Sequence, residues 1–328
     1  MKAAIRASPA ALLAVTACVA LAACGGSGAP RPATAETPLG APAVKLTTDE
    51  KRAWKLLPPD RSAIPVLLYH GIGPASDFSN ADDASYGIGV DDFAKQMTMI
   101  ARAGYQTISL KTFNDFVQGK PVELPPRPLL LTFDDARADS WTGADGILRK
   151  LHFNAVMFVD VGRVDAGDPE YLTWQRLQKL QGSGRWELQL HSGKGHVQIH
   201  YGPDDNDYGP FYAYEQPGED LPAWRTRVRS DLTWGQQTLS DHVPAYEPLA
   251  FAPPFGDYGQ DGSNDPRIAG DMLSWLTGRY RAVFTQDRNA RAKPGDQPPF
   301  GRIQVTRGTA GGDLYGSLLS GDSVVASS

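Results

Sequence analysis

The chain has 328 residues, a formal net charge of −5 at pH 7 and 41% hydrophobic residues. This length and composition predict a globular protein of one large or two small domains with a sizeable core. The negative charge argues against a protein that holds nucleic acid through its overall charge, so we expect no nucleic-acid partner.

Residues 1–23 predict a secretory signal. A basic start precedes an apolar, Ala-rich stretch over residues 10–23 that is too short to favour a transmembrane helix. The stretch ends in Leu21-Ala22-Ala23-Cys24, which resembles the lipobox of bacterial lipoproteins. We therefore expect a lipid on Cys24 and a secreted protein anchored to the outer face of the cell membrane, on its extracellular or periplasmic side. A plain signal peptide with a chance cysteine is the alternative.

The cysteines restrict the chemistry of the mature protein. Cys18 would leave with the signal and Cys24 would carry the lipid, so any metal would rest on histidine and carboxylate ligands. Residues 24–50 are rich in Pro, Gly and Ala and predict a flexible tether, because such a segment buries too little apolar surface to order itself. Residues 51–320 would then form the catalytic domain.

From Ile64 onward, apolar runs alternate with helical patterns. Strands are expected at 65–69, 128–133, 155–159, 186–190, 249–252, 282–285 and 303–305, and helices at 93–101, 174–180 and 224–239. Apolar strands separated by helices indicate a parallel sheet covered by helices. With about seven strands, we predict an α/β fold in the form of a distorted (β/α) barrel.

Polar residues follow several of these strands. His70, the pair Asp134 and Asp135, and His191 each come at the end of an apolar run, and His196 follows five residues after His191. In α/β barrels the active site lies at the carboxyl ends of the strands. Singly, the Asp pair could cap a helix and His191 could be a hydrogen-bonded loop residue. Together, two His around a Gly-containing turn and one Asp predict a metal site of the kind that hydrolytic zinc enzymes use.

The motifs resemble those of a known family. Leu131-Thr132-Phe133-Asp134-Asp135 resembles the Thr-Phe-Asp-Asp motif of polysaccharide deacetylases, carbohydrate esterase family four, and residues 191–196 resemble their second motif. The second His comes five residues on, where common members place it four residues on. That spacing, with a Tyr-His pair near the domain start, resembles the branch that deacetylates poly-β-1,6-N-acetylglucosamine and carries its motifs in circularly permuted order. The resemblance spans about residues 63–306.

The resemblance implies a role for each matching position. It makes Asp135, His191 and His196 the ligands of a divalent metal, with Zn²⁺ expected and Co²⁺ or Ni²⁺ as alternatives. It makes Asp134 the general base and His70 the general acid. The substrate would be an N-acetylated glycan, either a poly-β-1,6-N-acetylglucosamine-like exopolysaccharide or a cell-wall glycan.

The third motif matches only in part. Pro254-Phe255-Gly256 resembles it, and the Phe255 backbone N–H is the expected donor to the oxyanion. The family places an Arg two residues before the Pro of this motif, beside the base, where this chain has Ala252. Either another arginine, such as Arg302, substitutes for it, or the pKa of Asp134 is set in another way.

Residues 200–220 form a long stretch with no clear period. It starts four residues after His196 and carries four Tyr and a Phe, which distinguishes it from disordered segments. Aromatic rings suit the apolar face of a sugar, so Tyr208 and Tyr212 are candidate glycan contacts. Packing of these rings onto the domain is the alternative.

Two other functions compete with the deacetylase. A non-haem iron oxygenase also uses two His and one carboxylate, although usually through a His-x-Asp step on a β-sandwich. A deacetylase-like glycan-binding lipoprotein without catalysis is the second alternative. Asp134 argues against it, because binding alone needs no base.

Overall fold

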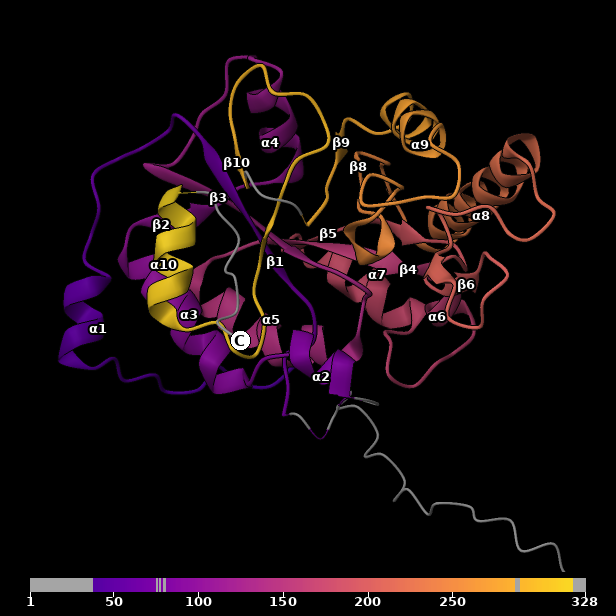
Figure 1. Cartoon of the computed structure of the whole chain (residues 1–328). Coiled ribbons are helices and arrows are strands. Elements are labelled where there is room, and N and C mark those ends of the chain that lie inside the picture. The colour runs from indigo at the N-terminus through magenta and orange to yellow at the C-terminus, as the bar shows by residue number, and fades with distance from the viewer. Residues whose placement is uncertain (1–37, 75, 77, 79–80, 287–289, 321–328) are drawn as a thin grey trace, which may run out of the picture. The chain divides into compact units, whose positions relative to one another are not determined.

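The computed structural model describes residues 38–74, 76, 78, 81–286 and 290–320 (Figure 1). The predicted signal over residues 1–23, Cys24 and the first part of the predicted tether lie outside the described residues. In the part of the chain that is described, no helix is both long and apolar enough to cross a membrane.

A curled, mostly parallel sheet forms the centre of the fold. Seven of its strands follow one another in the order β11-β1-β3-β4-β5-β8-β9, and all neighbours along this path are parallel. Their bounds are Ile303–Gln304, Ile64–Tyr69, Arg127–Phe133, Ala155–Asp160, Trp186–Ser192, Ala250–Phe251 and Ala282–Val283. A parallel bridge between Phe284 and Phe300 brings the chain beyond β9 beside the segment that leads into β11. The predicted α/β barrel of about seven parallel strands is confirmed.

Shorter strands lie outside this path. β10 (Arg291–Ala292) pairs antiparallel with β1, and β2 (Tyr105–Thr107) pairs parallel with β3. β6 (Gln198–His200) and β7 (Tyr208–Pro210) form a separate antiparallel hairpin.

Helices separate the strands along the chain. Their bounds are α1 Thr48–Ala53, α2 Ala81–Tyr86, α3 Val90–Arg102, α4 Leu110–Val117, α5 Ala138–Leu151, α6 Val161–Asp165, α7 Trp174–Gly182, α8 Leu221–His242, α9 Ile268–Thr277 and α10 Gly311–Ser320. α3 contacts α5, while α7 and α8 contact β5. Every residue of β1, β3 and β4 is buried, as expected for parallel strands covered on both faces.

The end of the predicted tether packs onto the domain. The backbone N–H of Leu39 donates to the Thr142 carbonyl at 2.8 Å, and Ala41, Val44 and Leu46 pack against the core. Residues 48–53 form α1, which begins with a capping box between Thr47 and Glu50. The structure therefore differs from a free tether over residues 39–50, because small apolar side chains there find partners on the domain.

Candidate metal centre and active site

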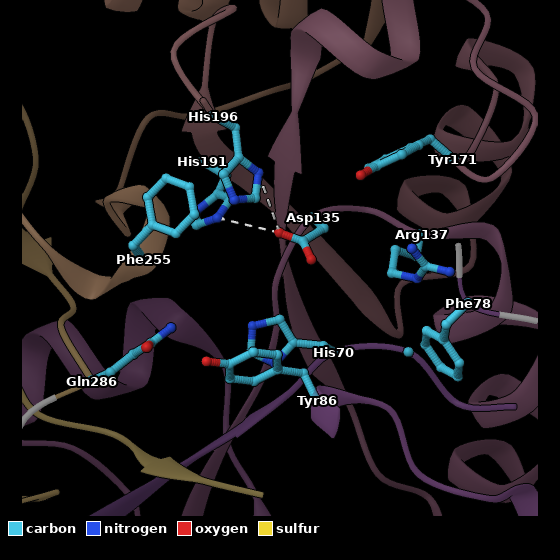
Figure 2. Close-up of a pocket in the computed structure, with 11 residues that line it drawn as sticks. His70, Phe78, Tyr86, Asp135, Arg137, Tyr171, His191, His196, Phe255 and Gln286 are labelled. Atoms are coloured by element: carbon cyan, nitrogen blue, oxygen red, sulfur yellow. Dashed lines mark ion pairs between the residues drawn. The ribbon is translucent and has the colours of Figure 1, made fainter. Parts of the chain in front are cut away.

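Three predicted ligands, Asp135, His191 and His196, lie together at the carboxyl ends of β3 and β5 (Figure 2). Asp135 Oδ1 is 3.4 Å from His191 Nε2 and 3.6 Å from His196 Nδ1. Ligand atoms about 2.0–2.2 Å from a tetrahedral zinc ion lie roughly 3.3–3.6 Å apart. The donor set and its spacing therefore fit a divalent metal.

His191 and Asp135 are held in place by their surroundings. His191 is 1% exposed, and its Nδ1 lies 2.7 Å from the Ala252 carbonyl, which leaves Nε2 to face Asp135. Asp135 and Ala136 both have positive φ, 75° and 61°, a conformation that costs energy for residues other than glycine. This strained turn after β3 presents the Asp135 carboxylate to the two imidazoles.

Asp160, at the end of β4, lies against the same cluster. Its backbone N–H donates to the Asp135 carbonyl at 3.3 Å, and its Oδ2 lies 3.2 Å from His196 Nδ1. Burial alone would lower the pKa of His196, but Asp160 and Asp135 outweigh it and raise that pKa. Sequence reasoning missed Asp160, although it ends an apolar run as His70 and Asp134 do.

Asp134 forms a buried ion pair with Arg302, which confirms Arg302 as the substitute for the missing third-motif arginine. The two guanidinium nitrogens donate to Oδ1 and Oδ2 at 2.7 and 2.8 Å, and both side chains are 0% exposed. Burial alone would raise the pKa of Asp134, but Arg302, with His191 and His70, holds it below its usual range. A lowered pKa favours the ionised carboxylate that a general base requires.

His70 follows β1 and lines the cavity beside Asp135 (Figure 2). Its ring lies 5.3 Å from that of Tyr86, and its Nδ1 is buried without a hydrogen-bond partner among the described residues. Burial lowers the pKa of His70 more than the nearby Asp135 and Asp134 carboxylates raise it. The structure thus places His70 at the site, as predicted, in a setting that favours its neutral form.

The metal cluster opens into a cavity of about 180 Å³. Its walls carry several aromatic rings and polar groups from distant parts of the chain: His70, Gly71, Phe78, Tyr86, Asp135, Arg137, Tyr171, His191, His196, Phe255 and Gln286. Asp134 is not among them and lies buried outside this lining. Phe255, in the short 3-10 helix Pro254–Gly256, has φ 61° and packs its ring 5.0 Å from that of His196.

Arg137 and Tyr171 are cavity residues that sequence reasoning missed. The two pair across an antiparallel bridge, and Arg137 forms ion pairs with Asp139 and Glu170. Figure 2 shows the Tyr171 hydroxyl directed toward Asp135. The sequence carried no signal for this pairing, since it depends on a bridge between segments more than thirty residues apart.

The two predicted glycan contacts in the 200–220 loop, Tyr212 and Tyr208, have different outcomes. Tyr212 is 0% exposed and its hydroxyl donates to Asp231 at 2.7 Å, so the prediction that it contacts the glycan is wrong. The ring belongs to the core, as the packing alternative proposed. Tyr208 is 54% exposed and lies 5.2 Å from the His200 ring, outside the cavity lining. Its contact with a glycan stays a prediction.

Comparison with known proteins supports the resemblance. Residues 122–267 match the family described as polysaccharide deacetylase, the family that the motifs resemble. A Bacillus subtilis protein, YxkH, named as a candidate polysaccharide deacetylase, is 27% identical over 179 residues. That alignment covers 51% of this chain and 58% of YxkH, so the chain matches little more than half of its relative's length.

Several solved structures share the fold. A de-N-acetylase from Aggregatibacter actinomycetemcomitans has a TM-score of 0.63 at 18% identity, over 76% of this chain and 97% of that one. IcaB from Ammonifex degensii has 0.58 at 24%, over 75% and 92%, and the BpsB deacetylase domain from Bordetella bronchiseptica has 0.60 at 21%, over 76% and 98%. This parallel α/β fold is not the β-sandwich expected of the oxygenase alternative.

Proposed function

We propose that this chain, which carries a polysaccharide deacetylase domain, is a metal-dependent hydrolase that removes N-acetyl groups from an N-acetylglucosamine-containing polysaccharide. The observation that carries the proposal is the buried Asp134–Arg302 pair beside the Asp135, His191 and His196 cluster. A protein that only binds glycan has no need of a carboxylate held ionised next to a metal site.

The cluster would hold the metal through Asp135, His191 and His196, with Zn²⁺ as the expected ion. When bound, a divalent metal supplies a Lewis acid and lowers the pKa of a coordinated water. The Ala252 carbonyl, 2.7 Å from His191 Nδ1, fixes the orientation of that imidazole and leaves its Nε2 for the metal.

The remaining chemistry rests on the protein's own side chains. Asp134 accepts the proton of the attacking water, since Arg302 keeps its carboxylate ionised. The Phe255 backbone N–H donates to the oxyanion that forms from the acetyl carbonyl. An amine is a poor leaving group, so His70 delivers a proton to the departing nitrogen. Because burial favours neutral His70, it takes up this proton from solvent before it acts as the acid, and the proton that Asp134 accepted returns to solvent after the acetate leaves.

The substrate proposed from the motif spacing is a poly-β-1,6-N-acetylglucosamine-like exopolysaccharide or a cell-wall glycan. A cavity of about 180 Å³ with aromatic walls suits an acetamido group and part of one sugar ring. We also propose that the protein works outside the cytoplasmic membrane, anchored through Cys24, on the strength of the Leu-Ala-Ala-Cys sequence that ends its signal.

The direct test is mass spectrometry of defined β-1,6- and β-1,4-linked N-acetylglucosamine oligomers after incubation with the protein and Zn²⁺ or Co²⁺. We expect loss of acetyl groups, release of an equal amount of acetate, and no reaction by Asp134→Asn. A protein that binds metal tightly and yet leaves both oligomers intact refutes the proposed activity.

A further inference from the structure

The turn between the two histidine ligands rests on α8 through a single carboxylate. Asp231 of α8 accepts the backbone N–H of Gly193 at 3.1 Å on Oδ2 and that of Lys194 at 2.6 Å on Oδ1. The buried Tyr212 hydroxyl also donates to Oδ2, at 2.7 Å. Gly193 and Lys194 lie between His191 and His196, so Asp231 holds the part of the chain that sets the distance between the two imidazoles.

Close packing fixes the same turn. A side-chain carbon added at Gly193 would lie 2.3 Å from the Asp231 carbonyl, and one added at Gly195 would lie 2.6 Å from the Tyr212 ring. These contacts are shorter than real carbon contacts, so both positions need glycine. The turn is thus in close contact with both α8 and the Tyr212 ring.

The opposite side of the turn is held by the backbone of α6. The Gly162 N–H donates to the Gly193 carbonyl at 2.7 Å. The Gly193 peptide is therefore bonded from both directions, from α6 at its carbonyl and from α8 at its N–H. Its freedom to shift depends on the one ionisable partner, Asp231.

We propose that Asp231 is a positioning residue that holds the His191–His196 turn in the geometry a metal needs, and that Tyr212 supports it. The inference rests on the proposed metal site, and it gives Tyr212 a role in place of the glycan contact. Hydrogen bonds to a charged acceptor are roughly twice as strong as neutral ones, so two backbone N–H groups on one carboxylate restrain the turn firmly. Burial and the Asp231 charge raise the pKa of Tyr212, so its hydroxyl remains a donor.

The His-x₄-His spacing explains why such an anchor is needed. His191 belongs to β5 and is fixed by the sheet and by the Ala252 carbonyl. His196 lies beyond the strand, at the far end of a turn that contains two glycines. Since glycines restrict the backbone least, the turn would sample other conformations without Asp231. Loss of the Asp231 carboxylate should therefore weaken metal binding through His196.

The test measures metal affinity rather than activity. Asp231→Ala and Tyr212→Phe are compared with the wild type for the Kd of Zn²⁺ against a competing chelator and for the visible absorption spectrum of the Co²⁺ form. Asp271→Asn is the matched control. Asp271 pairs with Arg225 and Arg229 of α8, so this variant loosens the helix without touching the turn.

We expect Asp231→Ala to weaken Zn²⁺ binding about 10–100-fold and to alter the Co²⁺ spectrum, the range known for residues that support metal ligands. Tyr212→Phe should weaken it less, because the two backbone bonds to Asp231 remain. Asp271→Asn should keep wild-type affinity and spectrum even if its melting temperature falls. If Asp231→Ala does not fold, the Zn²⁺ affinities of Tyr212→Phe and of an Asp231→Asn variant test the inference in its place.

Two results would overturn the inference: wild-type Kd and spectrum in Asp231→Ala, or an equal loss of affinity in Asp271→Asn, which would indicate a general effect of α8. The proposed function fails separately. A wild-type protein that binds Zn²⁺ but releases no acetate refutes the deacetylase proposal and leaves the role of Asp231 standing.

Discussion

Replacing Arg302 by Met should both destabilise the protein and disable the proposed base, Asp134. Arg302 donates two hydrogen bonds of 2.7 and 2.8 Å to Asp134, and neither side chain is exposed. Removing one partner of a buried pair costs about 3–5 kcal/mol, because the other charge stays buried without compensation. Burial, which opposes the lowered pKa in the wild type, would then raise the pKa of Asp134. For each unit by which the pKa of Asp134 exceeds the assay pH, the ionised fraction of its carboxylate falls about tenfold.

The assays are guanidinium unfolding at pH 7 in the presence of a chelator and acetate release with metal added. We expect a loss of about 3–5 kcal/mol in the free energy of unfolding and a fall in kcat of about 10²–10⁴-fold. The double variant Asp134→Asn/Arg302→Met should recover part of the stability but none of the activity, because neutral groups then replace the pair. Arg127→Met is the control. Arg127 is also buried, but its partners are the neutral Pro58 carbonyl and Tyr105 hydroxyl.

The pH dependence of the free energy of unfolding tests the direction of this effect. The folded-state pKa of Asp134 is lowered, so its contribution to stability is present above the unfolded value, about 3.9, and is lost as the pH falls through the folded value. In Arg302→Met the folded-state pKa of Asp134 should be raised, so protonation of Asp134 removes the buried charge as the pH falls. The stability gap between wild type and variant should therefore narrow on acidification from pH 7 to 4. A gap under about 1 kcal/mol at pH 7, or no coupling in the double variant, would refute the reasoning.

Three further predictions concern the metal, the acid and the anchor. His191→Ala and His196→Ala should each abolish Zn²⁺ binding and activity while keeping the circular dichroism of the fold; full metal stoichiometry in both would exclude this site. His70→Ala should slow amide hydrolysis about 10²–10⁴-fold but spare an aryl acetate ester, whose leaving group needs no proton, and an equal loss on both substrates would contradict an acid role. Cys24→Ala should move the protein from the membrane to the soluble fraction of the cell with unchanged specific activity, and continued membrane retention would argue against the anchor.

The long, fully buried strands were predictable because their pattern is unambiguous. β1, β3 and β4 read as apolar runs, and each ends at a polar residue that the structure places at the site. The two-residue strands β8, β9 and β11 fall inside the predicted segments, and β10 was not predicted. α5 was not predicted either, since its Gly, Asp and Ser residues have low helix propensity and most of its residues are buried.

Residues whose role depends on distant partners were harder to predict. Arg302 was one of two possible answers to the missing arginine, and only the pairing of β1 with β11 brings it to Asp134. Tyr212 is of a residue type that suits a sugar contact, but its hydroxyl donates to Asp231 of α8 and its ring is buried in the core. In both cases the sequence indicated the type of chemistry, and the tertiary contacts decided which residue performs it.

The parallel pairing of β1 with β11 also has a consequence for the order in which the protein matures. β1 leads into His70 near the start of the domain, while β11 directly follows Arg302 near its end, and the two strands pair through Leu67 and Ile303. A chain emerging from the ribosome would present the proposed acid and metal ligands long before Arg302, the cation that pairs with Asp134. The proposed active site would thus be incomplete until the last strand is in place, and a chain cut before residue 302, which also lacks the core residues Ile303, Val305, Leu314 and Leu318, should neither fold stably nor pair Asp134.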